Sequence, residues 1–174
     1  PRPKGTAQPP RRFRRMFEET LRLAAEDLTG GLVLPYAVLA MRLVGAALFS
    51  GLIGYERETG DHAAGLRTHM LVGIGAASFA LVAIHIVELF GHRPDTIRMD
   101  PIRLVEAATA GVAFLAAGMI VLSKGEVKNL TTGAGMWLAA AIGLACGLGL
   151  WPLAITATVL GVAVQALGRV THGS

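Results

Sequence analysis

The chain has 174 residues, of which 53% are apolar and 16% charged, and its mean hydropathy is +0.55. Soluble domains carry about 25% charged residues, so this composition argues against a soluble protein and favours a single membrane domain. The 16 basic and 12 acidic residues form no basic patch among exposed aromatic residues, which argues against a nucleic-acid partner. The single cysteine, Cys146, excludes an intrachain disulfide and a cysteine-based zinc site.

Residues 1–34 are predicted to form a basic tail that carries one amphipathic helix. Residues 1–10 are proline-rich and polar, a composition typical of disorder. From residue 11 to 28, RRFRRMFEETLRLAAEDL, apolar side chains recur at helical spacing and the arginines fall largely outside that stripe. This pattern predicts a helix lying on the membrane surface. An ordinary solvated helix is the alternative.

Five apolar segments follow, at residues 35–54, 70–90, 104–122, 133–150 and 151–168. Each is close to the ~20 residues that cross a bilayer core, and in hydrocarbon such spans must be helices. A soluble helical bundle is disfavoured because none of the segments shows a polar face. The predicted fold class is therefore all-α: a polytopic integral membrane protein with about five transmembrane helices after an N-terminal amphipathic helix. The transmembrane domain is expected to cover residues 35–170.

Gly143 and Gly147 form a GxxxG pattern in the fourth apolar segment. Small residues at this spacing allow two helices in a membrane to approach closely. The pattern leaves open whether the neighbour is a helix of this chain, a second copy in a homo-oligomer, or another membrane protein. Lys and Arg near the spans are divided almost equally between the two sides, so the orientation is not predicted.

Ionisable residues within or beside the apolar segments are the candidate functional residues. Arg42 lies inside the first segment, where an arginine either marks a functional site or extends its charge to the interface. Glu106 lies about one turn into the third segment, and its expected partners are Arg103 or Arg42. We predict that Arg42 and Glu106 pair, because each alone would be an uncompensated charge in hydrocarbon.

Oxygen ligands for a divalent cation are the second kind of candidate. Glu56, Asp100 and Glu106 are carboxylates close to the spans, and Mg²⁺ needs only one or two carboxylates because it retains several waters. Asp100, which precedes a proline, is also a strong helix N-cap, and Asn129, Thr131 and Thr132 are expected to cap the fourth span. No catalytic motif occurs, so an enzyme is not expected. No cofactor is expected, and Mg²⁺ is considered only as a ligand or substrate.

Four stretches of sequence resemble the MgtC/SapB family of bacterial membrane proteins: GLIGYERE at 51–58, AGLRTHMLVGIGAASF at 64–79, DPIRLVEAATAGVAFLAAGMI at 100–120 and LTTGAGMWLAAAIGLACGLG at 130–149. The resemblance carries the polar motif positions of the family over to Glu56, Arg57, Gly65, Arg67, Thr68, His69, Asp100, Arg103, Thr131, Thr132 and Trp137. Ala113 and Ala116 replace glycines found in many members, and Glu106 stands where many members have a nearby glutamine. We expect a membrane-only member without the C-terminal soluble domain of the virulence-associated members.

The resemblance implies a multi-pass protein of the bacterial cytoplasmic (inner) membrane that is linked to magnesium homeostasis. Two mechanisms stay open at this point. The protein either transports magnesium or another divalent cation, or it is a non-transporting regulator that binds another membrane complex such as the F-type ATP synthase. A carboxylate-lined cavity that reaches the midplane would favour transport, and a tightly packed interior with an exposed GxxxG face would favour regulation.

Overall fold

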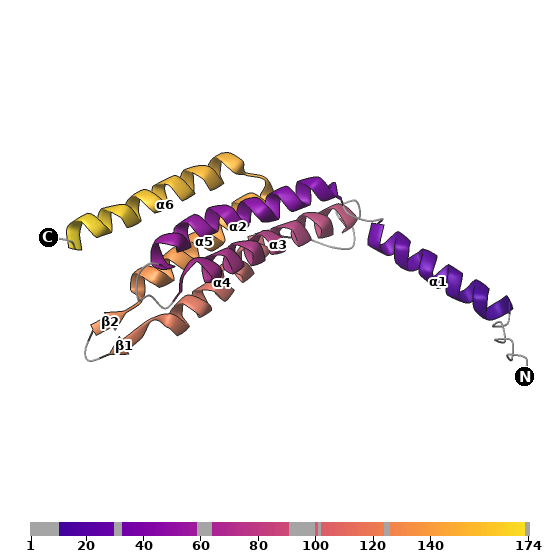
Figure 1. Cartoon of the computed structure of the whole chain (residues 1–174), viewed down its shortest axis with the longest axis horizontal. Coiled ribbons are helices and arrows are strands. Elements are labelled where there is room, and N and C mark those ends of the chain that lie inside the picture. Colours follow the sequence, from indigo (N-terminus) through magenta and orange to yellow (C-terminus); the bar gives the residue numbers. More distant parts are fainter. Residues whose placement is uncertain are drawn as a thin grey trace, which may run out of the picture. The chain divides into compact units, whose positions relative to one another are not determined.

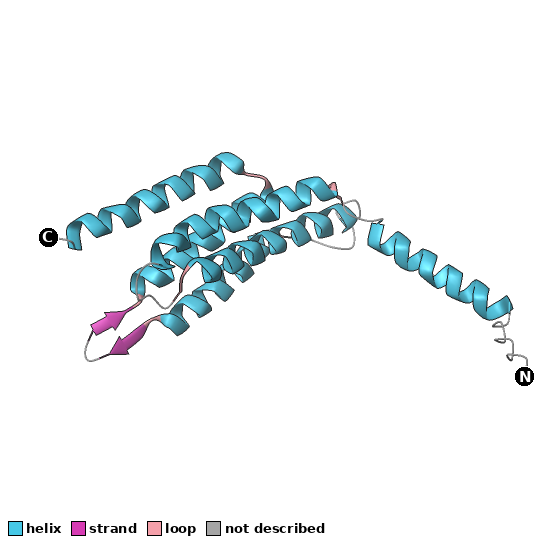
Figure 2. Ribbon diagram, in the orientation of Figure 1, coloured by secondary structure: helices cyan, strands magenta, loops and turns pink. Residues whose placement is uncertain are grey.

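The computed structural model describes residues 11–29, 33–58, 64–90, 100, 102–123 and 126–172. Six helices and one short hairpin make up this described part (Figure 2). The helices are α1 Arg11–Thr29, α2 Tyr36–Glu58, α3 Leu66–Phe90, α4 Ile102–Met119, α5 Leu130–Leu148 and α6 Trp151–His172, and the strands are β1 Val121–Ser123 and β2 Glu126–Lys128. The expected disorder of residues 1–10 lies outside the described residues.

α1 belongs to a unit of its own, residues 1–33, and the other helices belong to a second unit, residues 34–174. The predicted helix is present and extends one residue further, to Thr29. Its large apolar side chains up to Leu23, among them Phe13, Phe17 and Leu21, are each more than half exposed. Arg22 pairs with Glu26 one turn later, with 2.9 Å between Nε and Oε1. The apolar stripe is therefore uncovered, and its place on a membrane surface stays a prediction.

α5 is the central helix of the second unit. It packs against α2, α3, α4 and α6 (Figure 1), and most of its residues are buried. The core around it consists largely of alanines, with Ile53 of α2 and Ile142 and Cys146 of α5 as its larger members. Small side chains allow the helix axes to approach closely, which compensates for the absence of a hydrophobic driving force between helices in lipid.

The closest helix contact is between α3 and α5, at the glycines of the GxxxG pattern. A Cβ added to Gly143 would lie 2.8 Å from the Cα of Gly73, and one added to Gly147 would lie 2.6 Å from the carbonyl oxygen of Ala77. Both glycines are therefore used inside the chain, which answers the question that the sequence left open about their neighbour. A second copy or another membrane protein as a partner stays a prediction.

Among the described residues, three helices are long and apolar enough to cross a membrane: Tyr36–Tyr55, Leu66–Leu89 and Leu130–Leu148. Two shorter apolar helical stretches accompany them, Val105–Met119 and Trp151–Leu167. Large apolar side chains also cover the outside of the bundle, for example Phe114, which is 81% exposed. In water such a surface would aggregate. The chain is therefore an all-α membrane protein, as the composition predicted.

The ends of several elements differ from the sequence prediction. The third apolar segment was expected to continue to Leu122, but α4 ends at Met119 and residues 121–123 pair with 126–128 as an antiparallel hairpin, with Leu122 opposite Val127. α2 continues four residues past Gly54, and α3 begins four residues before Met70. The polar residues between the first two apolar segments are thus partly helical, because the backbone hydrogen bonds of α2 and α3 continue beyond the apolar residues of each helix.

A tight link joins α5 and α6 into an antiparallel hairpin. Gly149 has a left-handed backbone, with φ at 77°. The backbone N–H groups of Gly149 and Leu150 donate to the carbonyls of Cys146 and Ala145, at 3.0 and 2.8 Å. This is the usual glycine ending of an α-helix, and Pro152 fits the first turn of the next helix, where its missing N–H is not needed.

Candidate functional site

Polar side chains gather at two ends of the bundle formed by residues 34–172. α2 ends at one of them, and α3 and α5 begin there; we call it the His69 end. At the other, α2 and α6 begin and α5 ends; we call it the Arg42 end.

His69 is the centre of the first end. Its side chain is fully buried in the first turn of α3, and Nδ1 lies 2.8 Å from the carbonyl oxygen of Gly65. Glycines on two other helices make room for the ring. A Cβ added to Gly54 of α2 would lie 2.7 Å from the His69 Cβ, and one added to Gly135 of α5 would lie 3.1 Å from Nε2. The imidazole is therefore held between α2 and α5 by the absence of side chains on both.

Three buried polar atoms at this end have no hydrogen-bond partner among the described residues: Nε2 of His69, Nε of Arg57 and Oε1 of Gln165. The amide nitrogen of Gln165 would lie 3.7 Å from the same added Cβ at Gly135, so histidine and glutamine face one glycine from α3 and α6. Burying an unsatisfied polar group costs about 1–3 kcal/mol. Such a cluster is therefore suited to take up water or a small polar ligand.

Glu58 joins the end of α2 to the start of α3. Its Oε2 accepts the backbone N–H of Leu66 at 2.8 Å, and its carboxylate lies against Gly65, where any side chain would collide with it. A carboxylate stabilises a helix N-terminus because it meets unpaired N–H groups at the positive end of the helix dipole. The spacing of residues along the chain does not predict this cap, since seven residues separate Glu58 from the helix that it caps.

The remaining predicted residues at this end differ in exposure. Thr132 is buried, whereas Thr131 and Arg67 are exposed, and Thr68 is half-buried. Glu56 lies in the last turn of α2, but its side chain is outside the described part of the structure. Trp137, further along α5, is 55% exposed.

The expected cap at Asn129 is wrong. Its backbone is left-handed, with φ at 65°, and its side chain makes no cap hydrogen bond to α5. Nδ2 donates instead to the carbonyl oxygen of Met119, at 3.0 Å. Asn129 therefore ties the end of α4 to the start of α5 across the hairpin, a role suited to a residue that tolerates positive φ.

Arg42 dominates the opposite end. Its Nη1 donates to the carbonyl oxygen of Gly147 at 2.8 Å, and its guanidinium lies over Gly149, where an added Cβ would be 2.7 Å from Nη2. A cation at this position meets the negative end of the α5 dipole. The predicted pair with Glu106 is wrong: Glu106 is exposed on α4, whereas Arg42 donates to the end of α5. The free carbonyls of a helix end replace the carboxylate as the partner.

Asp100 caps α4 as predicted, because its Oδ1 accepts the backbone N–H of Ile102 at 3.0 Å. Arg103 and Glu106 lie exposed on the first turns of the same helix. Within the described residues no group of three or more His, Cys, Asp or Glu side chains is placed to hold a metal ion. A role of Glu56, Asp100 and Glu106 as cation ligands stays a prediction.

Comparison with known proteins places these features in a family. The sequence model of the MgtC family matches residues 43–174. Protein MgtC of Brucella abortus (strain 2308) is 40% identical over 135 residues, which are 78% of this chain and 53% of the relative. The "Putative magnesium transporter YhiD" of Escherichia coli (strain K12) is 37% identical over 128 residues, 71% of this chain and 57% of the relative.

Protein MgtC of Salmonella typhimurium (strain 14028s) is 36% identical over 138 residues, 79% of this chain and 54% of the relative. The chain thus spans about half the length of the curated relatives it matches. No solved structure matches it significantly. The matched region contains Arg57, His69 and the helices that surround them. Since the family model covers most of the sequence, the chain belongs to the MgtC family.

Proposed function

We propose that the chain is a multi-pass protein of the bacterial cytoplasmic membrane that regulates magnesium homeostasis and does not itself conduct ions. The link to magnesium is supported by the name of the Escherichia coli relative and by the family resemblance. Multiple crossings are supported by the three long and two shorter apolar helices of the described part. The regulated partner in this proposal is another complex of the same membrane, such as the F-type ATP synthase.

The contact between α2, α3 and α5 carries the non-conducting part of the proposal. Gly73 and Gly143 touch backbone to backbone. From the third side, Ser50 of α2 contacts Gly73 and donates its hydroxyl to the carbonyl oxygen of Ala139 at 3.0 Å. This packing leaves no width for a hydrated ion between the three helices. Mg²⁺ gives up its water reluctantly, so a route between them is disfavoured.

Charge supports the same conclusion. Arg42 and Arg57 are half-buried at opposite ends of α2. A divalent cation moving along this helix would meet a fixed positive charge at each end, and such repulsion is strong where the effective dielectric constant is low. Arg42 instead stabilises the bundle, because it donates to the carbonyl oxygen of Gly147 at the end of α5.

Divalent-cation transport is the second candidate, and one observation favours it. Nε2 of His69 and Oε1 of Gln165 are buried without partners at the His69 end. An imidazole nitrogen and an amide oxygen are both metal-ligand types. In this case a cation that enters at the His69 end would bind first to His69 Nε2 and Gln165 Oε1, and the Arg57 guanidinium would have to move away from them.

Magnesium flux into liposomes separates the two candidates. The purified full chain would be reconstituted in vesicles that contain a magnesium-sensitive dye, with protein-free vesicles as the baseline and a known magnesium channel as the positive control. We expect wild type and His69→Ala to match the baseline. Flux above the baseline that His69→Ala lowers would overturn the non-conducting role. Growth of a deletion strain at limiting magnesium would then measure function: we expect the wild-type gene to restore it.

A further inference from the structure

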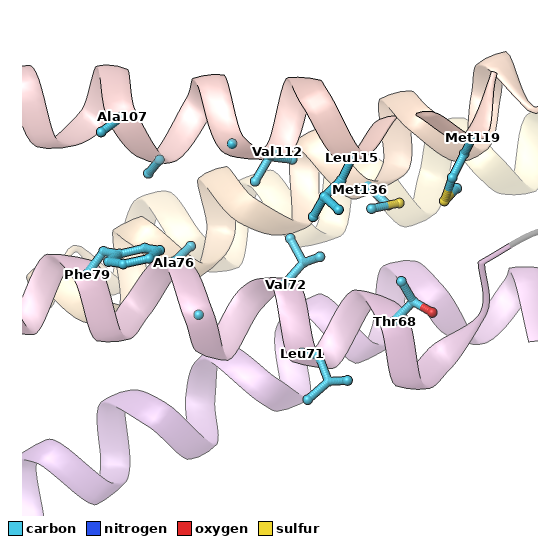
Figure 3. A pocket seen from close by; sticks show the side chains of 13 residues that line it. Thr68, Leu71, Val72, Ala76, Phe79, Ala107, Val112, Leu115, Met119 and Met136 are labelled. Carbon is cyan, nitrogen blue, oxygen red and sulfur yellow. The ribbon is translucent and has the colours of Figure 1, made fainter. Parts of the chain in front are cut away.

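A groove runs between α3 and α4, and Met136 of α5 also lines it (Figure 3). Its volume is about 530 Å³. Thr68 of α3 and Met119 of α4 lie at one end of the groove, and Phe79 and Ala107 lie at the other (Figure 3). The groove exists because α4 packs mainly against α5 and only lightly against α3.

The lining of the groove is apolar. Thr68 is the only lining residue with a polar side chain. Two glycines, Gly75 of α3 and Gly111 of α4, widen the groove from opposite sides. A Cβ added to either glycine would have no atom of the described residues within 4 Å. A ligand with hydrocarbon character and one polar end fits this distribution of groups.

The length of the groove corresponds to one leaflet of a bilayer. Thr68 and Phe79 are eleven residues apart on α3, which is about 16 Å along the helix at ~1.5 Å per residue. The hydrocarbon core of a bilayer is ~30 Å thick. Since Thr68 lies near the start of the span Leu66–Leu89 and Phe79 near its middle, the groove reaches from the membrane interface to the midplane.

The width of the groove suits an extended hydrocarbon chain. A volume of about 530 Å³ over a length of about 16 Å gives a mean cross-section of about 33 Å². The groove therefore accommodates one extended hydrocarbon chain along its length.

A positive charge lies beside the polar end of the groove. Arg67 directly precedes Thr68 in the first turn of α3, and its side chain is exposed. Arginine binds phosphate oxygens through charge-assisted hydrogen bonds, and basic side chains at the interface attract anionic headgroups. Charge, length and width thus agree on one occupant.

We propose that the groove between α3 and α4 binds one acyl chain of an anionic phospholipid, with the headgroup phosphate at Arg67. This inference rests on the membrane location in the proposed function but is independent of the role in magnesium homeostasis. A bound chain would fill the space between α3 and α4, so that the position of α4 would depend on the lipid.

Photocrosslinking in nanodiscs tests the proposal. The full chain would be placed in phosphatidylethanolamine nanodiscs with a trace of phosphatidylglycerol that carries a diazirine in the middle of one acyl chain. After irradiation, mass spectrometry would give the crosslinked fraction and the labelled residues. We expect labels concentrated at residues 72–79 and 107–115. The double variant Gly75→Leu/Gly111→Leu fills the groove and is expected to lower them by about tenfold.

Gly118→Leu is the matched control, because Gly118 is also on α4 with no described atom near an added Cβ but does not line the groove. We expect wild-type labelling in this variant. Arg67→Gln should lower labelling by the phosphatidylglycerol probe more than labelling by a phosphatidylethanolamine probe, whose ammonium group offsets the charge of its phosphate. Three results would each overturn the proposal. They are labels spread evenly over all helices, labelling of the filled variant equal to that of wild type, and stronger labelling of the groove by a free fatty acid probe than by phosphatidylglycerol. Magnesium flux affects none of these results.

Discussion

Two glycines of α3, Gly73 and Gly75, are two residues apart and should respond oppositely to the same substitution. A Cβ added to Gly73 would collide with the Ser50 hydroxyl and would lie 2.6 Å from the Ser50 Cβ and 2.9 Å from the carbonyl oxygen of Ala46. Around Gly75 no described atom lies within 4 Å of the same group. The structure therefore predicts that Gly73→Ala destabilises the bundle and that Gly75→Ala does not.

The size of the effect follows from three contributions. Alanine is better than glycine in a helix interior by ~1 kcal/mol, a gain that both variants share and that cancels in their difference. Overpacking at Gly73 costs about 1–3 kcal/mol. If the Ser50 hydroxyl is displaced from the carbonyl oxygen of Ala139, which it now meets at 3.0 Å, about 1 kcal/mol more is lost. The two variants should thus differ by about 2–4 kcal/mol in free energy of unfolding.

Thermal unfolding in a mild detergent measures this difference. At about 2–4 °C per kcal/mol for a chain of this size, Gly75→Ala should melt roughly 4–16 °C above Gly73→Ala. The double variant Gly73→Ala/Ser50→Ala serves as a control, because removing the hydroxyl relieves part of the collision and should recover part of the loss. Equal melting temperatures for the two single variants would refute the close contact between α2 and α3.

Two further predictions concern helix ends. Arg42→Ala should lower the free energy of unfolding by about 1–3 kcal/mol, because it removes a charged donor from the carbonyl of Gly147. Glu106→Gln should leave thermal stability unchanged, and equal losses in both variants would show that Arg42 and Glu106 pair after all. Glu58→Ala should lower the free energy of unfolding by about 1 kcal/mol and speed hydrogen exchange at the Leu66 amide, which donates to the Glu58 carboxylate. Glu58→Gln keeps an acceptor oxygen and should have a smaller effect on both. Unchanged exchange at Leu66 in both variants would exclude the cap.

The apolar helices could be predicted from sequence because hydrocarbon imposes the same requirement on every span. Runs of about 20 apolar residues have no other structure available in lipid, so α2, α3 and α5 appear where their composition placed them. The hairpin after α4 was missed because Val121 and Leu122 continue the apolar run without a break. Nothing in those two residue types distinguishes the end of a helix from the start of a short strand.

The candidate site was harder to predict, because its partners are backbone groups. Arg42 was expected to meet a carboxylate, yet it meets the carbonyl of Gly147, an acceptor that every residue carries and no pattern marks. His69 was assigned by resemblance, but its complete burial depends on Gly54 and Gly135, two glycines on other helices. Such complementarity is a property of three-dimensional packing, so it is absent from the spacing of residues along the chain.

The bond between Arg42 and the end of α5 has a consequence for how the protein is made. Arg42 leaves the ribosome about a hundred residues before its acceptor, Gly147. During that interval the guanidinium in α2 is unmatched, at a cost below the roughly 2.5–3.5 kcal/mol that insertion scales give for an arginine at the centre of a span. A nascent chain halted before Gly147 therefore keeps this charge unmatched. Docking of α5 ends that state.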